Sequence, residues 1–387
     1  MDRTTCGSSL PQAKQMSSLG FGALEPSADA ASHAFIFRQE RSMTCHHRFH
    51  SWLYLMPRHR RGLACAFAMM MMVMMTALPP SHAADESKGK KIAFLQTLAT
   101  HPYVVATTRS FRTRAEALGM EVTFFTSMLD AALQAQQIDD AIARKFDLVV
   151  VVPTSEQGVV PALVRAKQAG VPVVIVNNTP KDGTEELYLS FVGQDQTAMG
   201  RLAGGAMLNA LKDSGRVGGK VAMITGALQQ GIAPRRVAGF REAARANPKV
   251  EIVAVEDARW DTATSERIAG QLYARFAASG GLDAVYGMAD NQAAAAIRAA
   301  EAAGIAVSGK PKQLVVIGGN CLKEGLDAIK AGKMQATITQ IPTELGVRAA
   351  DVINEYFSGK KPPKEVLLPL AMVTKANVAQ WEAPCTY

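Results

Sequence analysis

A regular alternation of apolar runs and helical segments begins near residue 90, and it constrains the fold more than any other feature. The apolar runs are six or seven residues long, and several are rich in Val and Ile, as strands buried on both faces of a sheet are. Helical segments of about 10–18 residues separate them, which is typical of β-α-β units and parallel sheets. The ten predicted strands cover residues 91–97, 121–126, 147–153, 171–177, 220–225, 250–255, 282–288, 313–319, 334–340 and 365–370.

Ten strands are too many for one compact sheet in the roughly 300 residues that follow the leading segment, so we expect two sheets. The predicted fold class is therefore α/β, with two doubly wound parallel-sheet lobes. The length of 387 residues also suits two domains. Loops that face a ligand lie at the carboxyl ends of such strands, so two facing edges would form a cleft.

The segment before these strands is predicted to be an export signal. Basic residues at 58–61 precede an apolar stretch over 62–78, two prolines end it, and small residues follow. We therefore predict a cleavable signal peptide over residues 56–83 and a periplasmic protein. A membrane anchor is the alternative, but the apolar stretch is short for a bilayer. Residues 1–55 are interpreted as a non-native or disordered leader, with translation starting at Met56 instead of Met1.

The distribution of charge and histidine argues against several classes of function. The chain has 42 Lys and Arg against 34 Asp and Glu, but without the residues before 84 the net charge is only +4. No basic cluster with interleaved aromatic residues is present, so we expect no nucleic-acid partner. His101 is the only histidine after residue 84. A His-rich metal site is therefore not expected, and a Ser-His-Asp triad would have to use His101.

The turns after the predicted strands lack the motifs of nucleotide sites and of activated nucleophiles. No G-x-G-x-x-G follows the first strand, and the glycine-rich segment 214–220 precedes a strand instead of a helix. G-x-S-x-G and H-E-x-x-H are absent as well. We predict a protein that is not an enzyme and uses no cofactor. In an oxidising compartment Cys321 and Cys385 could pair, or both could remain unpaired small hydrophobic residues.

Five segments after residue 90 are distinctive through their order and spacing. They are IAFLQTLATHPYVVATTRSFRTRAEALGMEV, DLVVVVPTSEQGVVPALVRAKQAGVPVVIVNN, SFVGQDQTAMGRLAG, GFREAARANP and VIGGNCLKEGLDAIKAGKMQATITQIPTELG. Together they resemble the type I periplasmic sugar-binding proteins of ABC importers, most closely the ribose-binding kind. The resemblance covers nearly all of residues 90–375, and lactose-repressor-type regulators share this fold in their ligand cores.

The resemblance implies two lobes joined by a three-segment hinge. The chain would cross between the lobes near Gln194-Asp195, near Gln340-Ile341 and near residue 370. The N-terminal lobe would then comprise residues 90–194 with 341–369. The C-terminal lobe would comprise residues 195–340 with 370–387.

The resemblance also implies which side chains hold the ligand. Tyr103 and Trp260 lie where the family places aromatic rings against sugar faces, although core packing is the alternative role. Arg236 matches a hydroxyl-binding arginine, and a guanidinium offers five donors in a fixed fork. We interpret the adjacent Arg235 as a solvated charge on the helix surface.

Asp290 and Gln340 have two predicted roles each. Asp290 would accept two hydroxyl protons from the ligand, cap a helix, or do both. Gln340 would bind the ligand at the second crossing or form a hinge hydrogen bond.

Other positions differ from the family pattern. His101 and Val104 replace a common asparagine and a second aromatic residue, and Asn177-Asn178 replaces an Asp-Arg pair. Ala289 replaces an asparagine, and Asn320 an aspartate. The pocket would lose two carboxylates and one arginine relative to a ribose site, so we expect either a different small uncharged polar solute or weaker ribose binding. The predicted ligand-binding residues are His101, Tyr103, Asn177, Asn178, Arg236, Trp260, Asp290, Asn320 and Gln340.

We therefore predict a substrate-binding protein that closes at its hinge over a sugar or polyol and delivers it to the membrane permease of an ABC importer. A sensory protein that presents a sugar or small signal molecule to a membrane receptor, such as a chemoreceptor, is the alternative. A transcription-regulator core would need a helix-turn-helix before residue 90. An enzyme on this fold would need catalytic groups that the sequence lacks.

Overall fold

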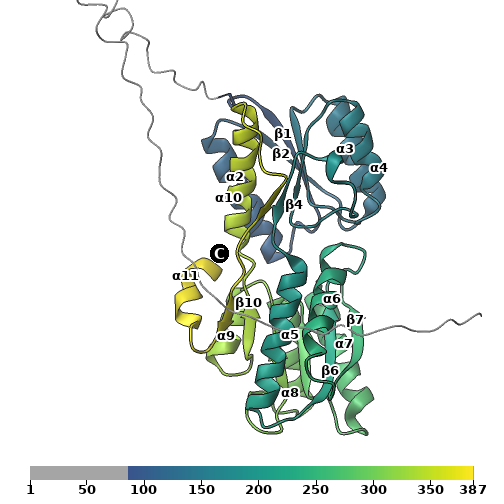
Figure 1. Ribbon diagram of the computed structural model, residues 1–387, viewed down its shortest axis with the longest axis vertical. Helices are drawn as coiled ribbons and strands as arrows, with labels where there is room; N and C mark the ends of the chain where they lie inside the picture. Colours follow the sequence, from purple (N-terminus) through teal and green to yellow (C-terminus); the bar gives the residue numbers. More distant parts are fainter. Residues whose placement is uncertain (1–85, 387) are drawn as a thin grey trace, which may run out of the picture. The chain divides into compact units, whose positions relative to one another are not determined.

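The computed structural model of this chain describes residues 86–386 (Figure 1). The predicted leader over 1–55 and the predicted signal peptide over 56–83 lie outside the described residues. Two six-stranded sheets, each covered by helices, form the described part. This confirms the predicted α/β class with two doubly wound, mainly parallel sheets.

The first sheet has the strand order β11-β5-β4-β3-β1-β2, and all of its strands are parallel. Two helices, α2 and α10, pack together on one face, and α3 and α4 cover the other (Figure 1). We call this sheet with these helices the first lobe. Its strands are β1 (Lys91–Gln96), β2 (Glu121–Thr126), β3 (Leu148–Val151), β4 (Val173–Val176), β5 (Ser190–Gly193) and β11 (Glu365–Leu367). Its helices are α2 (Pro102–Ala117), α3 (Ala131–Ala143), α4 (Val160–Gln168) and α10 (Pro342–Phe357).

The second sheet has the order β12-β10-β9-β8-β6-β7, and only β12 runs antiparallel to its neighbour. Two helices, α5 and α6, cover one face, and α7, α8 and α9 cover the other. We call this sheet with these helices the second lobe. Its strands are β6 (Gly219–Thr225), β7 (Val250–Asp257), β8 (Ala284–Gly287), β9 (Val315–Ile317), β10 (Ala336–Ile338) and β12 (Met372–Thr374). Its helices are α5 (Gln196–Asp213), α6 (Ile232–Ala244), α7 (Thr262–Ala277), α8 (Asp290–Ala302) and α9 (Lys323–Lys330).

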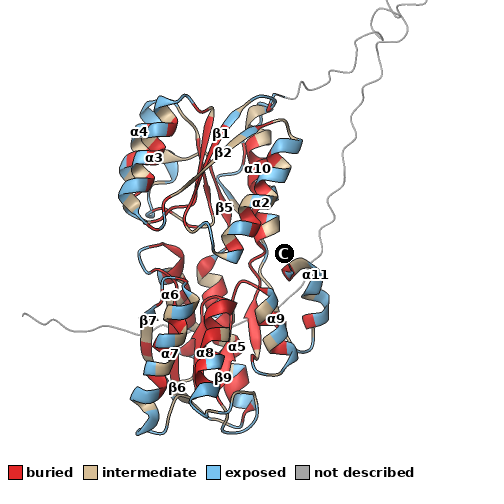
Figure 2. Cartoon of the chain, turned by 180° about the vertical axis from the view of Figure 1, so that it is seen from behind, coloured by how far each residue is buried: buried red, intermediate tan, exposed pale blue. Residues whose placement is uncertain are grey.

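The inner strands are the most buried elements of both lobes. Every residue of β3, β4, β8 and β9 is buried, as Figure 2 shows for strands of both sheets, while the edge strand β2 is only partly covered. Valine and isoleucine dominate β3, β4 and β9 because branched side chains pack well on a pleated surface. The short strands β5 and β12 were not among the ten predicted strands.

The chain passes between the sheets three times, after β5, after β10 and after β11. After the second passage, α10 returns to the first lobe and packs against α2. Leu345, Ala349 and Ile353 of α10 are completely buried there in one hydrophobic cluster with Phe94 and Phe111. The first lobe therefore depends on a helix that follows most of the second lobe in the sequence.

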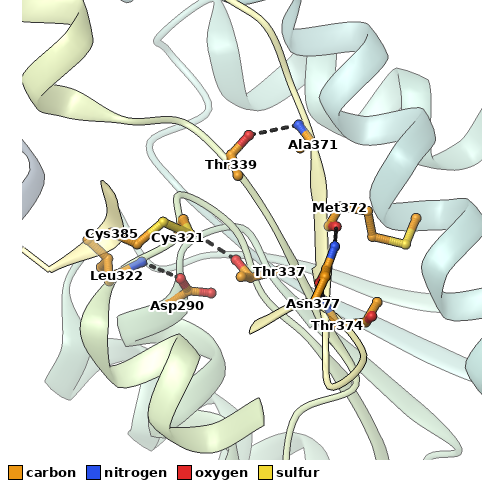
Figure 3. Close-up of a disulfide and its surroundings, with 10 residues drawn as sticks. All are labelled: Asp290, Cys321, Leu322, Thr337, Thr339, Ala371, Met372, Thr374, Asn377 and Cys385. Atoms are coloured by element: carbon orange, nitrogen blue, oxygen red, sulfur yellow. Dashed lines mark hydrogen bonds between the residues drawn. A yellow bond between two sulfur atoms is a disulfide. The ribbon is translucent and has the colours of Figure 1, made fainter. Parts of the chain in front are cut away.

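A disulfide joins Cys321 to Cys385, which answers the question that the sequence left open. Figure 3 shows the disulfide beside Leu322 and Asp290. Cys321 and Leu322 lie in the loop that follows β9. The bond attaches the short terminal helix α11 (Glu382–Cys385) to this loop. Within residues 86–386, no helix is both long enough and apolar enough to cross a membrane.

Candidate ligand-binding site

A cavity of about 40 Å³ is lined by residues of both lobes, mostly just after strand ends. The lining residues of the first lobe are Thr97, Leu98, His101, Tyr103, Val104, Asn177 and Asn178. Those of the second lobe are Gln230, Ile232, Arg236, Trp260 and Asn320, and Gln340 lies in the passage from β10 to α10.

The first turn of α2 supplies His101 and Tyr103. His101 is the N-cap residue, and its Nδ1 accepts a hydrogen bond of 3.2 Å from the backbone N–H of Tyr103. Pro102 at the first helical position fixes the backbone there. Burial lowers the pKa of His101 to about 4, so the imidazole is neutral at neutral pH. Burial also raises the pKa of Tyr103, whose hydroxyl lies 3.4 Å from Asn177 Oδ1.

The two asparagines after β4 form a hydrogen-bonded pair. Asn177 adopts a left-handed backbone with φ of 66°, which asparagine tolerates better than most residues. Its Nδ2 donates to Asn178 Oδ1 at 2.9 Å, and Asn178 Nδ2 donates to the carbonyl of Pro153 at 2.7 Å. Asn178 is therefore held from two sides.

Arg236 is the centre of the site and is completely buried. Helices α5 and α6 approach closely enough to hold it because Gly200 and Gly239 leave room, and a Cβ at Gly200 would overlap the carbonyl of Arg236. Its guanidinium donates four hydrogen bonds of 2.6–3.1 Å. The acceptors are Gln196 Oε1, the backbone carbonyl of Met288, Asn320 Oδ1 and Gln340 Oε1. Burial lowers its pKa, but an arginine side chain stays charged in proteins.

Trp260 forms the wall beside this guanidinium, whose carbon lies 5.6 Å from the ring centroid. This distance is within the range of a cation–π contact. The indole Nε1–H donates to Gln230 Oε1 at 2.6 Å. Gly226 makes room for the ring, since a Cβ there would overlap the indole carbons.

Gln340 connects the two lobes through its amide. Its Oε1 accepts from Arg236 at 2.6 Å, and its Nε2 donates to Asn177 at 2.7 Å and to Gln194 at 3.0 Å. Asn320, which follows β9 with φ of 82°, accepts from the same guanidinium at 3.1 Å. Asn177, Trp260 and Asn320 all have positive φ, and such strained positions are typical of functional sites.

Asp290 does not line the cavity, in contrast to our expectation. It is the first residue of α8, its carboxylate is buried, and its Oδ2 accepts from the Leu322 N–H at 2.6 Å. The side chain turns toward the loop after β9 because Gly318 and Gly325 leave space for it there. Burial raises the pKa of Asp290 to about 8. It is not the helix N-cap either, because Ala289 occupies that position.

Eight of the nine predicted residues thus line one cavity, and Asp290 is the exception. Sequence reasoning missed Thr97, Leu98, Gln230 and Ile232, and it noted Val104 only as a departure from the family pattern. Thr97 and Leu98 follow β1 directly, so the rule that ligands bind at strand carboxyl ends could have found them. Among residues 86–386, no cluster of three or more His, Cys, Asp or Glu side chains could hold a metal ion.

A family model described as a periplasmic binding protein domain matches residues 92–361, which is more than half of the chain. The chain belongs to the periplasmic binding protein family. This confirms the resemblance that the sequence suggested.

Curated relatives of this periplasmic binding protein include the ribose import binding protein RbsB of Bacillus subtilis (strain 168). It is 26% identical over 301 residues, which cover 77% of this chain and 92% of the relative. The D-allose-binding periplasmic protein of Escherichia coli (strain K12) is 25% identical over 295 residues, which cover 74% and 90%. Both relatives are named as solute-binding proteins, not as enzymes.

Solved structures of similar fold cover the same part of this periplasmic binding protein. An ABC transporter solute binding protein from Mycobacterium smegmatis with bound glycerol is 28% identical, with a TM-score of 0.68. The match covers 76% of this chain and 96% of that chain. A galactofuranose binding protein has a TM-score of 0.71 at 19% identity, covers 76% and 97%, and shows the likeness in fold alone.

Proposed function

We propose that this protein is a non-enzymatic, periplasmic substrate-binding protein of an ABC importer, which closes its lobes over a small polar solute of the sugar or polyol class. One observation carries the proposal: polar and aromatic side chains from both lobes line a single cavity. His101 and Tyr103 come from the first lobe, and Arg236, Trp260 and Asn320 come from the second. The names of the relatives support the same class of ligand.

The lining suits a ring that carries hydroxyl groups. Tyr103 and Trp260 are aromatic, and such faces pack well on the C–H surfaces of sugars. Amides of Asn177, Gln230 and Asn320 provide neutral hydrogen-bonding groups around them. A few placed polar groups within a mostly apolar lining are typical of small-molecule sites.

Hinge closure is the proposed mechanism, with residues 90–194 and 341–369 as one rigid lobe and residues 195–340 and 370–387 as the other. The parallel pairing of β11 with β5, and the pairing of β12 with β10, support this division. A ligand shifts the balance between open and closed forms only by its greater affinity for the closed form. A permease would then bind the closed arrangement, after removal of the signal peptide over residues 56–83.

Calorimetric titration and thermal melting of residues 84–387 test this proposal. The panel contains pentoses, hexoses, inositols and their oxidised and aminated derivatives. A ligand present at 100 times its Kd should stabilise the protein by about 2.7 kcal/mol. The proposal fails if a protein with a cooperative melting transition binds no member of the panel.

A further inference from the structure

The guanidinium of Arg236 is a buried charge without a counter-ion among the described residues. Its four partners are neutral oxygens of three amides and one backbone carbonyl, and it forms no ion pair with a carboxylate of residues 86–386. Removing a charge from water costs several kcal/mol, and buried charges in proteins are usually paired. The cavity therefore has a formal charge of +1 where the solute binds.

The hydrogen-bond directions around this cation follow from chemistry. A guanidinium can only donate, so Asn320 and Gln340 must both turn their carbonyl oxygens toward it. Gln340 then presents its NH₂ group to Asn177 Oδ1. Asn177 in turn must donate through Nδ2 to Asn178 Oδ1. Each of these amide oxygens thus accepts at least one hydrogen bond within the protein.

Several lining residues keep a donor group for a ligand. An indole N–H can only donate, so Gln230 turns its oxygen toward Trp260, and its NH₂ group remains. Asn320 likewise keeps its Nδ2. His101 Nδ1 accepts from a backbone N–H, so the proton of this neutral imidazole is on Nε2, which is buried and has no partner among the described residues. The lining residues thus carry three such donors and one cation, and no carboxylate is among them.

We propose that the solute is a sugar-derived carboxylate, of the aldonic or uronic acid class. This inference rests on the proposed function and replaces the uncharged solute that the sequence suggested. Each hydroxyl of a neutral sugar carries a proton that needs an acceptor, whereas a carboxylate only accepts and has about four lone-pair sites. Its charge of −1 balances the single cation, while a phosphate monoester would bring about −1.5 to −2.

Matched probes separate charge from shape. Titrations at pH 7.5 compare D-galactose with D-galactonate, D-galacturonate and D-galactosamine, then repeat the comparison in the gluco, arabino and ribo series. D-ribose 5-phosphate and D-glucose 6-phosphate form the phosphate arm. We expect at least one carboxylate to bind with a Kd at least tenfold lower than that of its neutral parent, and the amino sugars to bind worst.

A single substitution neutralises the charge of the site. Asn320→Asp places a carboxylate beside Arg236, so we expect the Kd of the carboxylate ligand to rise at least tenfold and that of its neutral parent to fall. Asn247→Asp adds the same charge at a half-buried position outside the cavity lining and should change neither Kd. If Asn320→Asp loses its cooperative melting transition, the comparison of acids with neutral sugars on the wild-type protein decides the question.

The outcomes distinguish the two proposals. If a neutral sugar binds as tightly as or more tightly than every acid, the inferred charge is wrong while the proposed function stands. Tighter binding of a sugar phosphate than of any carboxylate contradicts the carboxylate class. If the folded protein binds neither sugars nor acids, both proposals fail.

Discussion

Arg235 Nη2 lies 3.0 Å from Glu156 Oε1 and joins α6 of the second lobe to the segment before α4 of the first lobe. The same nitrogen lies 2.6 Å from Asp182 Oδ1. Only 22% of the Arg235 side chain is exposed, so the sequence-based view of it as a solvated helix charge was wrong. The pairs span the two lobes, and in the proposed mechanism of hinge closure they would stabilise the closed form.

Replacing Arg235 with alanine should therefore weaken ligand binding. Pairs that remain partly exposed contribute about 0.2–1 kcal/mol each, so we expect the loss of two pairs to raise the Kd about two- to thirtyfold. Arg201→Ala is the control, because Arg201 also pairs with two carboxylates, Asp195 and Glu242, but is not paired across the lobes. Titration calorimetry measures both variants, and equal changes in Kd would contradict a role in closure.

Gly226 sets the position of the indole that lines the cavity. A methyl group at this residue would overlap the Trp260 ring, so Gly226→Ala should displace the ring and raise the Kd at least tenfold. Overpacking of this kind also lowers the free energy of unfolding by about 1–3 kcal/mol. Gly270→Ala, on α7 with no neighbour within 4 Å, should leave the Kd unchanged. Wild-type affinity in Gly226→Ala would show that the ring position does not matter.

Gln340 satisfies polar groups on both lobes, so Gln340→Ala should destabilise the protein. The change leaves a guanidinium N–H and two amide oxygens without their partner. Each buried polar group that loses its partner costs about 1–3 kcal/mol. Urea unfolding monitored by circular dichroism measures the loss, with Gln271→Ala on exposed α7 surface as control. A difference below about 0.5 kcal/mol from the control would refute the role of this amide.

The disulfide should contribute measurably to stability. Its two cysteines are 64 residues apart, and a bond closing a loop of this size typically adds about 2–4 kcal/mol. We expect reductant to lower the melting temperature of the wild type and to have no effect on the Cys321→Ala/Cys385→Ala double variant. Identical melting of the wild type with and without reductant, after thiol titration has shown complete reduction, would rule this contribution out.

Asp290 should make stability depend on pH. Its folded-state pKa of about 8 lies above the ordinary value of 3.8, so the folded protein retains the proton. The resulting stabilisation is complete below about pH 4 and is lost as the pH rises through 8. An asparagine amide imitates the protonated carboxyl, so Asp290→Asn should gain stability relative to the wild type between pH 5 and pH 8. Urea unfolding at pH 5 and pH 8 measures this. The prediction is wrong if the free energies of unfolding of the variant and the wild type differ by the same amount at both pH values.

Much of the fold was predictable because strand and helix periodicities are local properties. The ten predicted strands all exist, and β2 has the predicted bounds. The two strands that the sequence did not predict are short: β5 has four residues and β12 has three. Such short strands exist because a neighbouring strand provides their hydrogen bonds, and this pairing cannot be read from one segment.

The site was predictable where a side chain follows a strand and unpredictable where distant residues decide its direction. Asp290 occupies such a strand end, but glycines at 318 and 325 draw its carboxylate away from the cavity. Arg235 and Arg236 are adjacent on one helix, and about 100° of rotation places one between the lobes and the other inside the site. The packing of α5 against α6 determines which of the two arginines enters the site.

Helix α10 has a consequence for the order in which the chain can fold. It covers the face of the first sheet next to α2, yet the whole of the second lobe up to β10 precedes it in the sequence. A polypeptide that leaves a ribosome or an export pore from its amino end must therefore leave the part of this face beside α2 uncovered until residue 357 has emerged. The hydrophobic core of the first lobe can thus be completed only after most of the second lobe has left the pore.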